Sequence, residues 1–178
     1  CGQITDGSVA VVLASDRFMQ RYATRRGVKA SEFPQILGRG HTNAGIRFLD
    51  KLERSKGEEY MFPHVRKAIT DAWRRAGING VEDLDGIETH DCFTSTEYMA
   101  IDHFGLTAPG QSWQAIDNGL VEIDGACPVN ASGGLIGVGH PVGATGARLL
   151  LDAGRQVTGT AGDYQVKGAR TYGTLNIG

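Results

Sequence analysis

A glycine-rich segment, residues 130–146, surrounds His140 and Pro141 with six glycines in fourteen residues. Glycine at this density lets the backbone turn tightly and approach a ligand closely. The segment runs into an expected helix near Ala144, and the first backbone amides of that helix could bind an anion. Histidine accepts a proton near neutral pH and is the usual partner of a thiol or hydroxyl nucleophile. His140 is therefore a candidate base, although these residues alone equally allow a structural histidine in a glycine-rich turn.

Two nucleotide-binding patterns fail in this segment. A P-loop ends in Gly-Lys-Ser or Gly-Lys-Thr, and residues 130–146 contain no lysine. A dinucleotide fingerprint requires GxGxxG, whereas Gly137, Gly139 and Gly143 miss that spacing by one residue. The glycines therefore indicate a loop that fixes the position of a histidine.

A second segment, His90-Asp91-Cys92-Phe93, lies between the end of an expected strand and the start of an expected helix. Loops at the carboxyl ends of strands in α/β sheets are where ligands tend to bind. A thiol beside a helix N-terminus ionises more readily, so Cys92 is a candidate nucleophile or acid/base. A small buried hydrophobe is the commoner fate of a free cysteine, and both interpretations stay open at this point.

Metal binding and disulfides are not expected. Cys1, Cys92 and Cys127 are too few for a disulfide framework and include no CxxC pair. His90 and His103 straddle a helix boundary without a matching cluster. Free thiols are typical of a reducing compartment, and Cys127 is expected to be structural.

The composition excludes several classes of protein. The 178 residues carry a formal net charge of −2, with no block of five like charges. No extended positively charged surface that would attract nucleic acid or an anionic membrane is therefore expected. No run of 18 apolar residues and no signal peptide is present. The length suits one domain of ordinary size, or one domain and a fragment.

Strands and helices alternate along the chain, which predicts an α/β layered domain. Strands are expected at residues 9–13, 33–42, 84–89 and 169–177. Helices are expected at 16–26, at 63–76, from Thr94 to Gly105, and from about 144 through Leu149 and Ala153. Thr94 and Glu97 form a capping-box pattern. The chain begins without Met and ends on a strand with no evident partner, so we expect a piece of a longer protein.

Together these segments resemble the thiolase family. Residues 130–146 resemble the Gly-His-Pro motif of the family, and residues 90–93 resemble the HDCF motif of its sterol-carrier-protein-type class, where other thiolases have Asn-Glu-Ala-Phe. Residues 5–13 resemble the strand that closes the N-terminal domain, and residues 159–178 resemble the approach to the last hairpin. The likeness extends over nearly the whole chain.

The resemblance implies a thiolase-like layered fold, in which two similar halves each contain a mixed sheet flanked by helices. Residues 1–30 would be the last strand and following helix of the N-terminal domain. Residues 31–178 would be the C-terminal domain without its final strand. The nucleophilic cysteine and most of the loop domain that binds coenzyme A would lie upstream. The partners implied are the rest of the same chain and a second copy, in a homodimer or homotetramer.

The resemblance also implies a role for four residues. His140 would activate the upstream cysteine for attack on an acyl-CoA, giving a covalent acyl-enzyme. Cys92 would be the acid/base for the incoming coenzyme A thiol or the substrate α-carbon. His90 would hold the thioester oxygen as it gains negative charge, and the backbone N–H of Gly178 would contribute to a second oxyanion hole. Coenzyme A would be a substrate, with no permanently bound cofactor.

One departure from the family pattern concerns Asn176. Many thiolases have Cys-x-Gly where this chain has Asn176-Ile177-Gly178. Asparagine cannot shuttle a proton as a thiolate can. In the sterol-carrier-protein-type class the HDCF cysteine is thought to take over that duty, so the substitution favours this class. It also leaves room for a relative with other chemistry.

Two alternative functions stay open. One is a thiolase-like carbon–carbon lyase of the aldolase type, which works with a small partner protein; such relatives usually lack one of the two motif histidines, and both are present here. The other is a non-catalytic protein that binds coenzyme A esters. The cytoplasm, or the peroxisome of a eukaryote, is the expected compartment.

Overall fold

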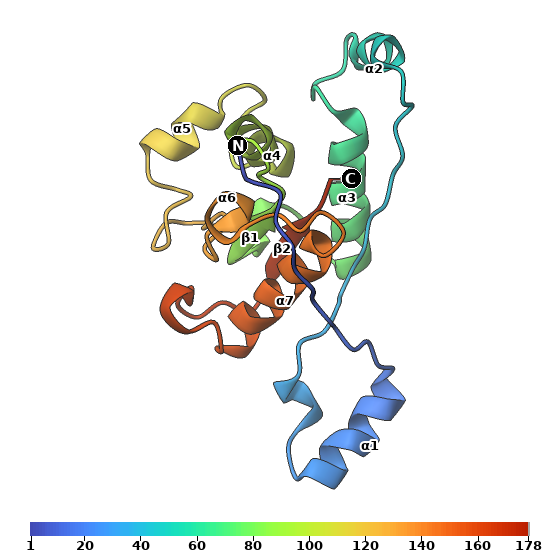
Figure 1. Ribbon diagram of the computed structural model, residues 1–178, viewed down its shortest axis with the longest axis vertical. Coiled ribbons are helices and arrows are strands. Elements are labelled where there is room, and N and C mark those ends of the chain that lie inside the picture. The colour runs from blue at the N-terminus through green and yellow to red at the C-terminus, as the bar shows by residue number, and fades with distance from the viewer. Residues whose placement is uncertain (178) are drawn as a thin grey trace.

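Two short parallel strands form the centre of the computed structural model, which describes residues 1–177. β1 (Gly86–Thr89) pairs with β2 (Tyr172–Leu175) in a register that sets Gly86 opposite Tyr172 and Thr89 opposite Leu175. Val129 extends this pairing through an isolated parallel bridge to Ile87. Helices pack on both faces of the strand pair (Figure 1). The predicted α/β class is confirmed, with a two-stranded sheet in the described residues.

Seven α-helices surround the strands in residues 1–177. They are α1 (Asp16–Arg26), α2 (Phe48–Ser55), α3 (Pro63–Ala76), α4 (Thr94–Phe104), α5 (Ser112–Asp117), α6 (Gly134–Val138) and α7 (Thr145–Thr158). Three short 3-10 helices are η1 (Ala30–Glu32), η2 (Val81–Asp83) and η3 (Gly162–Tyr164). The helices predicted at 16–26 and 63–76 are confirmed. Each ends at a glycine in the left-handed region, Gly27 at φ 68° and Gly77 at φ 72°.

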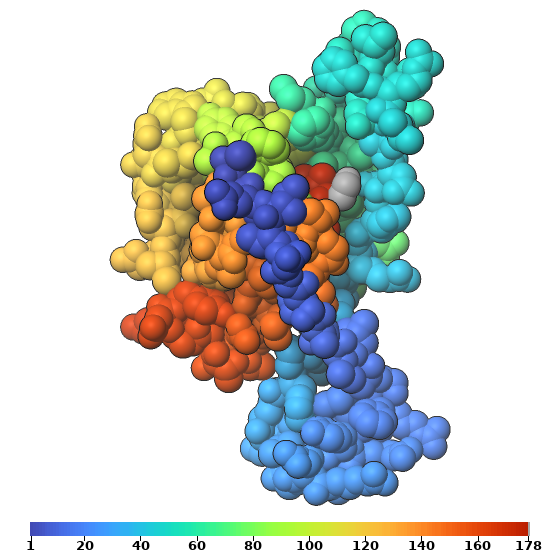
Figure 2. Space-filling view, in the orientation of Figure 1, coloured from blue at the N-terminus to red at the C-terminus, as the bar shows by residue number. Residues whose placement is uncertain are grey.

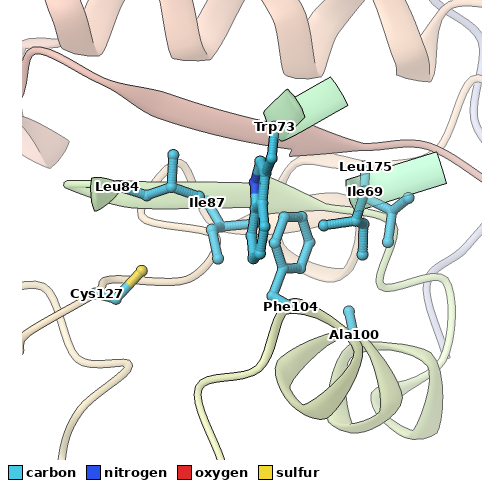
Figure 3. Close-up of a cluster of buried hydrophobic side chains, with 8 residues drawn as sticks. All are labelled: Ile69, Trp73, Leu84, Ile87, Ala100, Phe104, Cys127 and Leu175. Atoms are coloured by element: carbon cyan, nitrogen blue, oxygen red, sulfur yellow. The ribbon is translucent and has the colours of Figure 1, made fainter. Parts of the chain in front are cut away.

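The apolar core lies on the face of the sheet that α3 and α4 cover (Figure 3). α3 contributes Ile69 and Trp73, and the Trp73 ring lies 6.3 Å from that of Phe104 on α4. Ile87 of β1 and Leu175 of β2 complete the contact with the strands. The core prediction for Trp73 is confirmed.

Cys127 belongs to this core, as predicted. Its side chain is buried, and burial raises the pKa of the Cys127 thiol to about 12. A thiol that resists ionisation is a poor nucleophile. Cys127 is therefore a packing residue.

Two of the predicted strands are wrong. Residues 9–13 and 33–42 have an extended course without strand pairing, and Val12 is 90% exposed. A strand needs a neighbour for its backbone hydrogen bonds, and these segments have none among residues 1–177. The second segment instead runs along α3, where a Cβ on Gly38 or Gly40 would overlap a backbone carbonyl oxygen of the helix. The two segments lead to α1 and η1, which stand apart from the body (Figure 1).

The predicted capping box at Thr94 is also wrong. Phe93 occupies the N-cap position of α4 without a side-chain hydrogen bond. The Glu97 carboxylate instead accepts a hydrogen bond from the Asn130 amide at 3.3 Å. A tertiary partner therefore replaces the local cap.

We expect the substitution Trp73→Ala to lower the free energy of unfolding by about 3–5 kcal/mol, the usual cost of truncating a buried aromatic side chain. Trp113 is 49% exposed on α5, so Trp113→Ala is a matched control with an expected effect within about 1 kcal/mol. Urea unfolding of the purified protein measures both values. Equal losses in the two variants would contradict the assignment of the core.

Candidate active site

The predicted site segments meet at the carboxyl ends of β1 and β2. β1 leads into His90, Asp91 and Cys92, and β2 leads into Asn176. The strands are parallel, so their ends lie at the same edge of the sheet, where ligands bind in α/β folds. The His90 amide donates to the Leu175 carbonyl at 2.9 Å and continues the ladder one residue past β1.

His140 comes from the glycine-rich segment and lies against His90. The two ring centroids are 5.0 Å apart and the rings are nearly perpendicular, at 89°. Both side chains are largely buried, with 7% of His90 and 8% of His140 exposed. The tertiary structure thus brings together two histidines that are fifty positions apart in the sequence.

A hydrogen-bonded neighbour fixes the orientation of the His140 ring. Its Nδ1 lies 2.8 Å from the hydroxyl of Thr145, a fully buried residue at the start of α7. The Thr145 hydroxyl donates in turn to the Pro141 carbonyl at 3.5 Å. When the Thr145 hydroxyl donates to Pro141, Nδ1–H of His140 donates to Thr145 and the Nε2 lone pair is free to accept a proton.

Burial and neighbouring charges favour the neutral form of the His140 ring. Burial is the main cause that lowers its pKa below the ordinary value of 6.5, and the nearby His90 and Arg148 act in the same direction. The Asp91 carboxylate opposes them. A histidine with a lowered pKa is unprotonated at neutral pH, which is the state that a base requires.

Cys92 follows the buried Asp91 and precedes α4. Its side chain is partly exposed, and Sγ lies 3.9 Å from the Thr96 hydroxyl in the first turn of α4. The Cys92 carbonyl accepts a hydrogen bond from Gly2 at 2.8 Å. The thiol is therefore more accessible than that of Cys127. Gly178, the fourth predicted site residue, lies outside the described residues.

Asp91 anchors the glycine-rich segment to the strand ends. Its carboxylate accepts a hydrogen bond from the Leu135 amide at 2.6 Å. Gly134 has φ +60°, and a Cβ there would overlap the Asp91 carboxylate. This close approach explains one glycine of the segment, and the short helix α6 begins at this residue.

Hydrogen bonds of Glu88 and Asn130 also anchor the glycine-rich segment to β1. The Glu88 carboxylate accepts hydrogen bonds from the Ser132 amide at 3.1 Å and from the Ser132 hydroxyl at 2.6 Å. The Asn130 side chain accepts from the Thr89 amide at 2.7 Å. Asn130 has φ +54°, a conformation that asparagine tolerates better than most residues.

Sequence analysis missed these anchors: Glu88, Asp91, Asn130 and Thr145 were given no role. An acidic residue inside an expected strand, such as Glu88 next to Ile87, is the signal that was available, because charged residues are seldom buried without a partner. In residues 1–177 no group of three or more His, Cys, Asp or Glu side chains is arranged to hold a metal ion.

Comparison with known proteins identifies the family. The family model of the thiolase C-terminal domain-like proteins matches residues 48–178. The chain belongs to the thiolase family. This result confirms the resemblance drawn from the two motifs. The acetyl-CoA acetyltransferase of Methanothermobacter thermautotrophicus is 33% identical over 179 residues, which cover 100% of this chain and 43% of that protein.

The chain is also similar to a sterol carrier protein and to a solved aldolase structure. Human sterol carrier protein 2 is 32% identical over 178 residues, covering 100% of this chain and 31% of that protein. A solved structure, the Ltp2-ChsH2(DUF35) aldolase, superposes with a TM-score of 0.63 and 21% identity over 77% of this chain and 35% of that chain, which supports the fold alone. The chain spans less than half the length of these relatives.

Glu88 should make stability depend on pH. Burial raises its pKa from 4.5 to about 7, so the folded protein holds this proton more tightly than the unfolded chain does. The stabilisation of the folded protein by this bound proton is fully present below pH 4.5 and is lost as pH rises through 7. We expect Glu88→Gln, which keeps the shape without the charge, to gain about 1–3 kcal/mol relative to the unsubstituted protein between pH 5 and pH 8.

Chemical unfolding at both pH values measures this gain. Glu122 is exposed, so Glu122→Gln is the matched control and should show the same stability difference at pH 5 and pH 8. A pH-independent effect of Glu88→Gln would show that the Glu88 carboxylate is not perturbed.

Proposed function

We propose that this chain supplies the acid/base half of a thiolase active site, which cleaves or forms 3-ketoacyl-CoA through an acyl-cysteine intermediate. The observation that carries the proposal is the meeting of His90 and His140, with ring centroids 5.0 Å apart, beside the Cys92 segment at one end of the strands. Coenzyme A and its acyl thioesters are substrates in this proposal, and no permanently bound cofactor is needed.

His140 is the proposed base. Its Nε2 is free because Nδ1 is bonded to Thr145 at 2.8 Å, and its lowered pKa favours the neutral ring. It would take the proton of a nucleophilic cysteine in the N-terminal half, so that the thiolate attacks the acyl carbonyl. The leaving group, which is coenzyme A in the forming direction and the α-carbon of an acyl-CoA in the cleaving direction, would depart and take up a proton. The acyl group would then pass to a second thiol or carbon nucleophile.

Cys92 is the proposed second acid/base. Cys92 is partly exposed and lies directly before the N-terminus of α4, beside the two histidine segments. It would remove or return the proton of the incoming coenzyme A thiol or of the substrate α-carbon. Asn176 occupies the position of the cysteine in the Cys-x-Gly pattern and cannot perform this transfer.

His90 is the proposed group that binds the thioester oxygen, and the Gly178 N–H is proposed for the second oxyanion hole. Losing one such donor typically costs about 3–4 kcal/mol of activation free energy. The retention of both motif histidines supports acyl transfer over the aldolase-type alternative, and the upstream cysteine is what distinguishes acyl transfer from the non-catalytic alternative.

The larger assembly is part of the same proposal. Residues 1–30 would end the N-terminal domain, residues 31–178 would form most of the C-terminal domain, and the complete protein would be a homodimer or homotetramer. Each helix in residues 1–177 is too short or too polar to span a bilayer. The free Cys1, Cys92 and Cys127 support a reducing compartment, which would be the cytoplasm or a peroxisome.

In the full-length protein, Cys92→Ala and His140→Ala should each lower thiolysis of acetoacetyl-CoA and of a longer 3-ketoacyl-CoA by at least about a hundredfold, as expected for positioned acid/base groups. Cys127→Ala changes a cysteine that is buried in the core and should leave kcat within about threefold. An inactive parent that still binds coenzyme A esters would favour the lyase or non-catalytic alternative. Full activity in Cys92→Ala would overturn the role of that thiol.

The isolated 178-residue chain should show no thiolase activity, because the proposed nucleophile is not part of it. The same thiolysis assay, run with the purified chain and with the full-length protein as the positive control, tests this expectation. Measurable turnover by the isolated chain would require a nucleophile within it and would refute the proposed division of the site.

A further inference from the structure

Asn176 makes a side-chain contact with His90 that its place in the motif does not explain. Its Oδ1 lies 3.2 Å from Nδ1 of His90. Asn176 directly follows β2, and the His90 amide bonds to Leu175, so the pairing of the strands holds the two residues side by side. Position 176 therefore contributes to the site even though asparagine carries no proton to exchange.

Close packing restricts the Asn176 amide. Gly146 lies in the first turn of α7, and a Cβ at that position would come within 3.2 Å of the Asn176 side-chain carbon and nitrogen. The absence of a side chain at Gly146 leaves the space that the amide fills. The amide thus lies between α7 on one side and the His90 ring on the other.

The chemistry of the contact determines where the His90 proton lies. An amide oxygen only accepts hydrogen bonds, so a bond between Oδ1 and Nδ1 requires the proton on Nδ1. In the neutral ring Nε2 then carries a lone pair. It becomes a donor only when the ring takes up a second proton.

We propose that Asn176 is a positioning residue that holds His90 with its proton on Nδ1. Under the proposed thiolase function, Nε2 is then the ring atom that faces the thioester oxygen, and it donates to that oxygen once it carries a proton. The cysteine of other thiolases is thus replaced by a group that sets the state of the neighbouring histidine.

The test compares two isosteric variants of Asn176 by 15N NMR of histidine-labelled protein, with the His90 signals assigned by their loss in His90→Gln. Asn176→Asp keeps an acceptor oxygen and should keep the proton on Nδ1. Asn176→Leu removes the acceptor and should move the neutral ring to the Nε2–H tautomer. Asn118 is exposed at the end of α5, so Asn118→Leu is the control and should leave the His90 signals unchanged.

Two spectral outcomes would overturn the proposal: a proton on Nε2 of neutral His90 in the unsubstituted protein, or a tautomer that Asn176→Leu does not change. The spectra need no substrate, so they can contradict the role of Asn176 while the thiolase function is supported. Equally, the thiolysis assay can contradict the thiolase function while the spectra support the role of Asn176. In the thiolysis assay Asn176→Leu, which no longer holds the His90 ring in one orientation, should lose about 10- to 100-fold in kcat with little change in KM. Asn176→Asp should retain at least ten times the kcat of Asn176→Leu, whereas a merely structural role would affect both variants alike.

Discussion

The parallel pairing of β1 with β2 is the constraint on which the rest of the site depends. Thr89 lies opposite Leu175, so both chains leave the sheet at the same edge and deliver His90 and Asn176 side by side. A slip of one residue would turn the His90 side chain to the opposite face. The apolar cluster of Ile87, Leu175 and the facing side chains of α3 and α4 stabilises this register, because the cluster is buried only when the strands pair correctly.

Three acidic side chains then fix the glycine-rich segment against the strand ends. Glu88 binds Ser132, Asp91 binds Leu135, and Glu97 binds the Asn130 amide. Burial raises the pKa of Glu88 and of Glu97, so these carboxylates are costly to keep inside the protein. Costly features such as buried carboxylates are common at functional sites. Their presence here is consistent with a site whose glycine-rich segment must be held in one position.

The N-terminal segment is also bound to this site. Gly2 donates to the Cys92 carbonyl at 2.8 Å, and Thr5 donates to the His140 carbonyl at 3.2 Å. The first residues therefore run across the surface of the glycine-rich segment and α7 (Figure 2). The N-terminal segment therefore lies beside the backbone of both Cys92 and His140.

The sequence by itself determined the family, the α/β class and the helices whose ends are marked by local chemistry, such as Pro63 at the start and Gly77 at the end of α3. It also marked the segments of His90, Cys92 and His140 as candidates for a site, because glycine density and strand-end position are local patterns. Only the tertiary structure decided that residues 9–13 and 33–42 are unpaired in residues 1–177, that Glu97 binds Asn130, and that Asn176 contacts His90. These outcomes depend on partners between roughly twenty and ninety positions away, which no local pattern can specify.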